Sequence, residues 1–310
     1  MKSMLWLLAA ALLPSAAVPT RAQAPDYIAS GSTITRSELS DPALRAQLIE
    51  EGRRNGLAQD QKFQAKEALE KGDMATAFSL LQQSVHNNPI DGMACVLLAY
   101  FYVQKGQPAN VIATLDPIVN FGPYNSHSTG REPTTRMIYV LAQLDRYAWK
   151  EAVACYEQTW RPRSNPIFGA HAESHLWDLP GGGPVHSWPD LKFSADVPDY
   201  TGMRAQAHLI IGTTLPDCME EKDQYPYMLD HLKQVLRINP NSLDAHFVSG
   251  WLLGKTARFA EARIEYALAA RFASPDAQKE ITAELTKLKD KEESVKRFQT
   301  SQAARASKAK

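Results

Sequence analysis

Residues 95–119 read CVLLAYFYVQKGQPANVIATLDPIV, two apolar helical segments joined by a short polar turn that contains a glycine. A shift of 34 residues along the chain places Ala65 on Ala99 and Gly72 on Gly106. Two antiparallel helices that cross closely need a small side chain at the crossing and a permissive residue where the chain reverses. The spacing therefore predicts helical hairpins that recur along the chain.

The same pattern returns near the C-terminus. A shift of 151 residues carries Ala99 to Gly250 and Val111 to Ala262. A proline follows Asn88 and another follows Asn239, and each stops one helix before the next begins. Residues 58–91, 92–125 and 243–276 are the best-matched units.

These hairpins resemble the tetratricopeptide repeat, a helix–turn–helix of 34 residues with the pattern W-x2-L-G-x2-Y, then A-x3-F, then P. Leu98-Ala99 followed by Tyr102 matches the L-G-x2-Y part, and Ala262 followed by Tyr266 matches the A-x3-F part. No tryptophan opens any repeat. The resemblance implies an all-α, right-handed α-solenoid, in which the first helix of each pair forms a concave wall that binds a protein or peptide.

Applied along the chain, the pattern predicts five helix pairs. In one pair Ala142 and Ala152 stand two residues closer together than the family spacing allows, and the unit 205–242 is four residues too long. We expect this order of segments: signal peptide 1–22, extended arm 23–42, repeats 43–125, degenerate helix pair 126–160, ordered Pro-, Gly- and Trp-rich insertion 161–200, repeats 201–276, capping helix 277–298 and disordered basic tail 299–310.

The first 22 residues have the three parts of a secretory signal peptide: a positive start at Lys2, an apolar run, and small residues leading to Ala22. Pro14 interrupts the apolar run before it reaches the roughly 20 residues that a membrane span needs. We therefore expect cleavage near Ala22, a periplasmic or secreted location, and no membrane span in the mature chain.

Charge and cysteine content exclude several classes of protein. The 34 basic residues balance 34 acidic ones, which argues against a protein that coats nucleic acid or an anionic membrane. Three cysteines are too few for a disulfide-built scaffold. Cys95 and Cys155 lie in apolar helical stretches and are expected to be buried, whereas Cys218 lies in a polar connection and is the candidate for reactivity.

The insertion offers the one metal-site candidate. His171 and His175 are four residues apart, and His186 follows eleven residues later. Two histidines at helical spacing without a matched third ligand recur by chance, so no metal is favoured. This segment leaves open an alternative function: a metal-binding protein or metal-dependent enzyme with its site within 165–190, for which zinc is the candidate metal.

No nucleophile elbow or other catalytic constellation is present in the sequence. We therefore expect a non-enzymatic scaffold without a cofactor, which binds a protein or peptide and not nucleic acid. An aromatic side chain beside lysines suits a peptide with an apolar anchor and an acidic group. A further possibility is that the insertion itself fills the concave wall. The residues expected on that wall are Lys62, Lys66, Val96, Tyr100, Gln104, Phe247, Trp251 and Lys255.

Overall fold

The computed structural model describes residues 40–120, 133–160, 192–213 and 221–308, and every regular element in these ranges is an α-helix. The expected signal peptide, most of the arm and most of the insertion lie outside the described residues. In chain order the helices are α1 (Pro42–Glu70), α2 (Met74–Asn87), α3 (Gly92–Gln104), α4 (Pro108–Val119), α5 (Pro133–Asp145), α6 (Trp149–Trp160), α8 (Tyr200–Thr213), α9 (Glu221–Ile238), α10 (Leu243–Lys255), α11 (Phe259–Phe272) and α12 (Pro275–Lys308).

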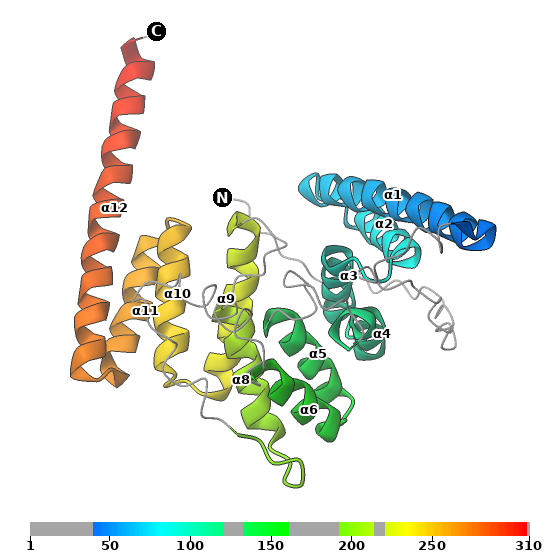
Figure 1. The fold of residues 1–310 in the computed structure, drawn as a ribbon. Helices are drawn as coiled ribbons and strands as arrows, with labels where there is room; N and C mark the ends of the chain where they lie inside the picture. Colours follow the sequence, from blue (N-terminus) through cyan, green and yellow to red (C-terminus); the bar gives the residue numbers. More distant parts are fainter. Residues whose placement is uncertain (1–39, 121–132, 161–191, 214–220, 309–310) are drawn as a thin grey trace.

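The helices form five packed hairpins, as the sequence predicts. The pairs are α1 with α2, α3 with α4, α5 with α6, α8 with α9, and α10 with α11, and each pair packs against the next. Figure 1 shows them side by side in one arc that runs from α1 to α12. The all-α, TPR-like solenoid predicted from the spacing is therefore confirmed.

Four of the hairpin turns share one backbone geometry. Gly72, Gly106, Tyr147 and Ala257 all have positive φ, between 57° and 76°. In each turn the next residue donates its N–H to a carbonyl five residues back, as Gln107 does to Tyr102 at 2.9 Å. This hydrogen bond closes the helix C-terminus in the Schellman manner. Glycine adopts this left-handed backbone freely, which explains why two of the four turns carry it.

The helix crossings follow the same register. Seven residues before the turn and nine after it stand two buried residues, in the pairs Ala65 and Leu81, Ala99 and Leu115, Val140 and Tyr156, and Gly250 and Tyr266. At Gly250 an added Cβ would lie 3.0 Å from the Tyr266 ring. A small residue at this position is therefore required by the close approach of α10 and α11.

The register also corrects the sequence interpretation of the hairpin α5–α6. Counted from the turn at Tyr147, the crossing residue on α5 is Val140, and the spacing from Val140 to Ala152 equals that from Ala99 to Val111. The apparent loss of two residues came from taking Ala142 as the crossing. The crossing residue here is a valine, so a search for small residues at the crossings does not find it.

The hairpin α8–α9 is longer than the others between the two residues that meet at its crossing. Gly212 is the crossing residue, since an added Cβ would lie 2.7 Å from Leu232 Cδ2. Gly212 and Leu232 are four residues further apart in sequence than the facing pairs of the other hairpins. The four surplus residues therefore lie between Gly212 and Leu232.

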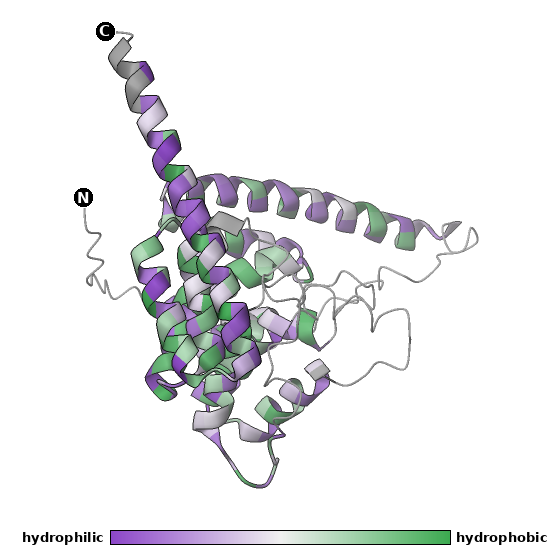
Figure 2. Cartoon of the chain, turned by 90° about the vertical axis from the view of Figure 1, so that its left-hand side faces the viewer, coloured by the Kyte–Doolittle hydropathy of each residue, from purple (hydrophilic) through white to green (hydrophobic). Residues whose placement is uncertain are grey.

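Helix α12 covers the last hairpin and then continues alone. The Ser274 hydroxyl caps its start, accepting from Ala277 N at 3.3 Å, and Ile281 and Leu288 are buried in the core. Its far half extends beyond α10 and α11, and Figure 2 shows that half to be largely hydrophilic. The expected disordered tail is wrong for residues 299–308, which are helical, since alanine, glutamine, lysine and arginine favour helix.

At the other end of the array, Asp41 and Pro42 begin helix α1. Asp41 accepts from Ala43 N at 2.8 Å, and Pro42 occupies the first turn. The helix then continues without a break into the first repeat. Within the described ranges, none of the helices combines the length and the apolar character that a bilayer crossing demands.

Candidate functional site

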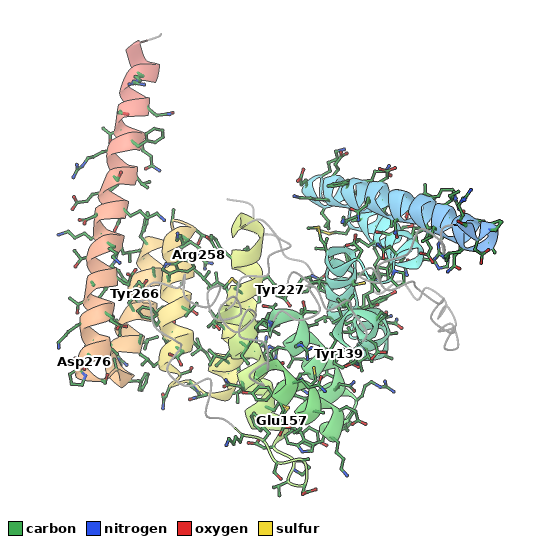
Figure 3. The ribbon with its side chains drawn as sticks, viewed as in Figure 1. Tyr139, Glu157, Tyr227, Arg258, Tyr266 and Asp276 are labelled. Atoms are coloured by element: carbon green, nitrogen blue, oxygen red, sulfur yellow. The ribbon has the colours of Figure 1, made fainter. Side chains whose placement is uncertain are left out.

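A pocket of about 360 Å³ lies where α10, α11 and α12 meet. Tyr266, labelled in Figure 3, lines it from α11. Two residues of the expected concave wall, Trp251 and Lys255, line it from α10. The remaining lining residues are Gly254, Glu284, Lys287, Leu288 and Lys291.

A close helix contact sets the register of this pocket. An added Cβ on Gly254 would lie 2.7 Å from Leu288 Cδ1, so α10 and α12 approach each other at the glycine. One turn further along α12, Lys291 Nζ donates to the carbonyl of Gly254 at 2.9 Å. Residues 284, 287, 288 and 291 share one helix face by their spacing, which aims Glu284, Lys287 and Lys291 at the pocket.

The pocket carries an excess of positive charge. Glu284 is its one lining carboxylate and pairs with Lys287, with Nζ and Oε1 2.7 Å apart. The lining therefore contains no second carboxylate that could pair with Lys255 or Lys291. Partial burial, together with the neighbouring charge of Lys255, lowers the pKa of Lys291. An anion entering the pocket would therefore relieve repulsion between the two ammonium groups.

An indole lies directly beside these cations. Lys255 Nζ lies 4.9 Å from the centroid of the Trp251 ring, a cation–π contact. Trp251 is half-buried and packs edge-on against Tyr225, with centroids 6.0 Å apart. The arrangement offers an apolar surface and an anion-binding surface within one pocket.

The structure does not bring the other expected wall residues together with this pocket. Lys62 is held by Asp91 at 2.7 Å, with its side chain only 12% exposed. Phe247 packs against Tyr266, with centroids 5.6 Å apart. Lys66 and Gln104 are exposed on α1 and α3, far along the array from α10.

Val96 and Tyr100 correct the sequence prediction. Val96 is fully buried, and Tyr100 is 8% exposed with its ring centroid 4.2 Å from that of Tyr227 on α9. Tyr100 therefore packs between hairpins, and neither residue is available to a partner on an open wall. Residues 92–104 form the first helix of an interior hairpin, and such a helix is covered by the pairs on both sides.

Lys287, Lys291 and Glu284 were missed by the sequence interpretation. They lie on α12, which was expected only to cap the array with a charged outer face. Their spacing places them on one helix face, but the contacts of Gly254 with Leu288 and Lys291 were needed to show that this face meets α10.

The described cysteines are not poised as nucleophiles. Cys95 and Cys155 are buried and free, as expected. Burial raises the pKa of the Cys95 thiol far above its usual value and that of Cys155 to about 11, and only a thiolate attacks well. Cys218 lies outside the described residues.

No metal site is present among the residues that the structure describes, because no three or more His, Cys, Asp or Glu side chains are grouped to hold an ion. The candidates His171, His175 and His186 lie outside those residues. The described part of the chain therefore lends the zinc alternative no support.

No family model matches the chain. Two proteins of Escherichia coli, from strain K12 and from O157:H7, both described as cellulose synthase operon protein C, are 34% identical to it over 93 residues. This segment is 30% of the present chain and 7% of the relatives. The chain thus spans less than a tenth of the length of the curated relatives it matches.

Several solved structures show a loose likeness. Pseudomonas aeruginosa pilF has a TM-score of 0.31 at 13% identity, covering 78% of this chain and 89% of that one. A thermophilic TPR protein of Thermus thermophilus has a TM-score of 0.27 at 17% identity, covering 74% and 98%. Scores this low carry no argument, so the assignment of an all-α, TPR-like solenoid rests on the hairpin register itself.

Proposed function

We propose that the chain is a non-enzymatic scaffold that binds a protein or peptide partner through the pocket between α10, α11 and α12. The observation that carries the proposal is the half-buried Trp251 indole beside the ammonium groups of Lys255 and Lys291. The one carboxylate of the lining, Glu284, pairs with Lys287 and with neither of them. We place this activity outside the cytoplasm, on the strength of the signal-peptide pattern in residues 1–22.

A peptide with an apolar anchor and flanking carboxylates fits this pocket. The apolar side chain would pack on the indole face, where aromatic contacts contribute most to binding. The carboxylates would pair with Lys255 and Lys291, whose mutual repulsion they relieve. Both contacts come from rigid helices, so little ordering is needed on the side of the scaffold.

The test is fluorescence anisotropy with a panel of labelled decapeptides in which Leu or Phe is flanked by Glu and Asp. We expect Trp251→Ala to weaken binding of the best peptide about 30-fold, since aromatic anchors dominate interfaces. Lys255→Glu should weaken it about tenfold and reduce its salt dependence. Peptides with Lys in place of the acids should not bind.

The matched control is Lys289→Glu, the same charge change on an exposed position of α12 that does not line the pocket. It should change affinity less than about twofold. Equal losses from Lys255→Glu and Lys289→Glu would show a nonspecific charge effect. Unchanged affinity in Trp251→Ala, with helicity retained, would remove the pocket from the proposal.

A further inference from the structure

A second pocket lies in the interior of the array. It has a volume of about 110 Å³ and is lined from α3, α4, α5, α8 and α9, so three successive hairpins meet around it. Tyr227, labelled in Figure 3, lines it from α9. Most of its wall is apolar: Val103, Pro108, Val111, Ile138, Leu141 and Ala142.

Two histidines face each other in this pocket. His208 Nδ1 on α8 lies 2.8 Å from His231 Nδ1 on α9. A hydrogen bond at this distance needs a proton on one nitrogen and a lone pair on the other. If both nitrogens carried protons, two N–H groups would point at each other and the bond would be lost.

The groups around the two histidines include no unpaired carboxylate that could balance the charge of a protonated imidazole. Asp145 of α5 lines the pocket but is paired with Arg204 of α8, since Arg204 Nη1 lies 2.7 Å from Asp145 Oδ1. From α9 comes the Tyr227 ring, with its centroid 4.5 Å from that of His231. The lining from α3 and α4 contains no titratable group, and no residue of α10 lines the pocket.

These surroundings keep both imidazoles neutral. Burial, followed by the Arg204 charge and offset in part by Asp145, lowers the pKa of His208 to about 4. Burial, followed by the neighbouring His208, lowers the pKa of His231 to about 3. Among the described residues no third ligand is grouped with the pair.

We propose that His208 and His231 form a proton-sensitive contact between α8 and α9, at the interface of this hairpin with α3, α4 and α5, which stays closed while both imidazoles are neutral and opens on acidification. Protonation of both imidazoles removes their hydrogen bond and places two cations beside Arg204 in an apolar pocket. The two charges would weaken the packing of α8 and α9 on α3, α4 and α5, while each hairpin stays helical. The inference is independent of the peptide-binding pocket.

The direction with pH follows from the pocket. Once the contact opens, the histidines regain a pKa near 6.5, so the open form binds more protons than the closed form. The closed form is therefore favoured fully above about pH 6.5 and loses its advantage as the pH falls toward 4. The effect is expected between about pH 6.5 and pH 4 and not at neutral pH.

The first test compares the melting temperature of the full chain at pH 7.5 and pH 5.0. The wild type should lose at least about 5 °C, the shift expected for two histidines that each carry more than one unit of pKa difference. The double variant His208→Asn, His231→Asn keeps donors and acceptors without the titration and should lose less than half as much. The control His86→Asn, at an exposed histidine, should behave as wild type.

Hydrogen exchange of the wild type at the two pH values, corrected for intrinsic rates, decides the matter even if the double variant does not fold. Protection of α5, α8 and α9 should fall at pH 5.0 while α10 and α11 keep theirs and helicity is unchanged. Equal protection at both pH values, or a loss spread evenly over all hairpins, would overturn the inference. So would a double variant that folds and retains the full acid sensitivity.

Discussion

The interior pocket and the end pocket are built from hairpins of the same kind, but the charges that line them differ. In the interior, hairpins pack on both sides, the histidines stay neutral, and the carboxylate of Asp145 is already paired with Arg204. At the end, α12 alone covers the outer side of α10 and α11, and three lysines share a larger pocket with one carboxylate. Burial from two sides imposes neutrality, whereas burial from one side leaves cations that water still reaches.

The same contrast applies to the glycines at the two helix contacts, and it gives the largest expected effect. At Gly212 an added Cβ would meet Leu232 Cγ at 2.7 Å and the backbone oxygen of Met228 at 3.2 Å. At Gly254 it would meet only the terminal Cδ1 of Leu288, at 2.7 Å. A side-chain end can rotate away, whereas a backbone carbonyl in a packed helix cannot.

Gly212→Ala should therefore lower the free energy of unfolding by about 2 kcal/mol, through overpacking of the interior. Gly254→Ala should change it by less than about 0.5 kcal/mol, because the better helix propensity of alanine offsets the adjustment of Leu288. Urea titration followed by circular dichroism measures both. Similar costs for the two variants would show that the end contact is as rigid as the interior one.

The turns provide a second, smaller comparison. Gly106 of the interior hairpin and Ala257 of the last hairpin have the same left-handed backbone, with φ of 62° and 59°. Only Ala257 carries the steric cost of a Cβ in that conformation, about 1 kcal/mol. Ala257→Gly should therefore raise the free energy of unfolding by about that amount, and Gly106→Ala should lower it by a similar amount.

Melting curves of the two single variants and of the double variant would test the turn prediction. The two changes lie in different hairpins and should be additive in the double variant, which should then resemble the wild type. A loss of stability in Ala257→Gly would mean that flexibility gained by the unfolded chain outweighs the relief of strain.

The residues that sequence analysis could interpret are those where only one kind of side chain fits. Ala65, Ala99 and Gly250 mark crossings that admit nothing large, and Gly72 and Gly106 mark left-handed turns, so five hairpins could be counted without coordinates. Val140 and Tyr147 occupy the same two positions in α5–α6 at a tolerable cost. A pattern that depends on small residues therefore does not detect Val140 or Tyr147.

The sequence could predict the part of the candidate site that lies on α10, but not the part that lies on α12. Trp251 and Lys255 could be nominated because they follow Gly250 on one helix at known spacing. Lys291 and Glu284 reach them from α12, and His231 reaches His208 across a connection of unusual length. Such contacts depend on the register between helices, which is fixed by side-chain packing and leaves no fixed spacing in the sequence.

The smallest expected effect concerns the repulsion between the ammonium groups of Lys255 and Lys291 in the end pocket. Lys255 contributes to the lowered pKa of Lys291, so Lys255→Gln should raise the pKa of Lys291 toward its usual value while partial burial keeps it somewhat below. The free energy of unfolding should change by less than about 0.5 kcal/mol, because the ammonium groups are solvated and the lost cation–π contact is partly exposed. NMR titration of the lysine side-chain signals measures the pKa, with Lys289→Gln as the control that should leave Lys291 unmoved. If the Lys291 pKa stays the same in Lys255→Gln, the two ammonium groups do not interact, and the pocket lacks the mutual repulsion that an acidic partner would relieve.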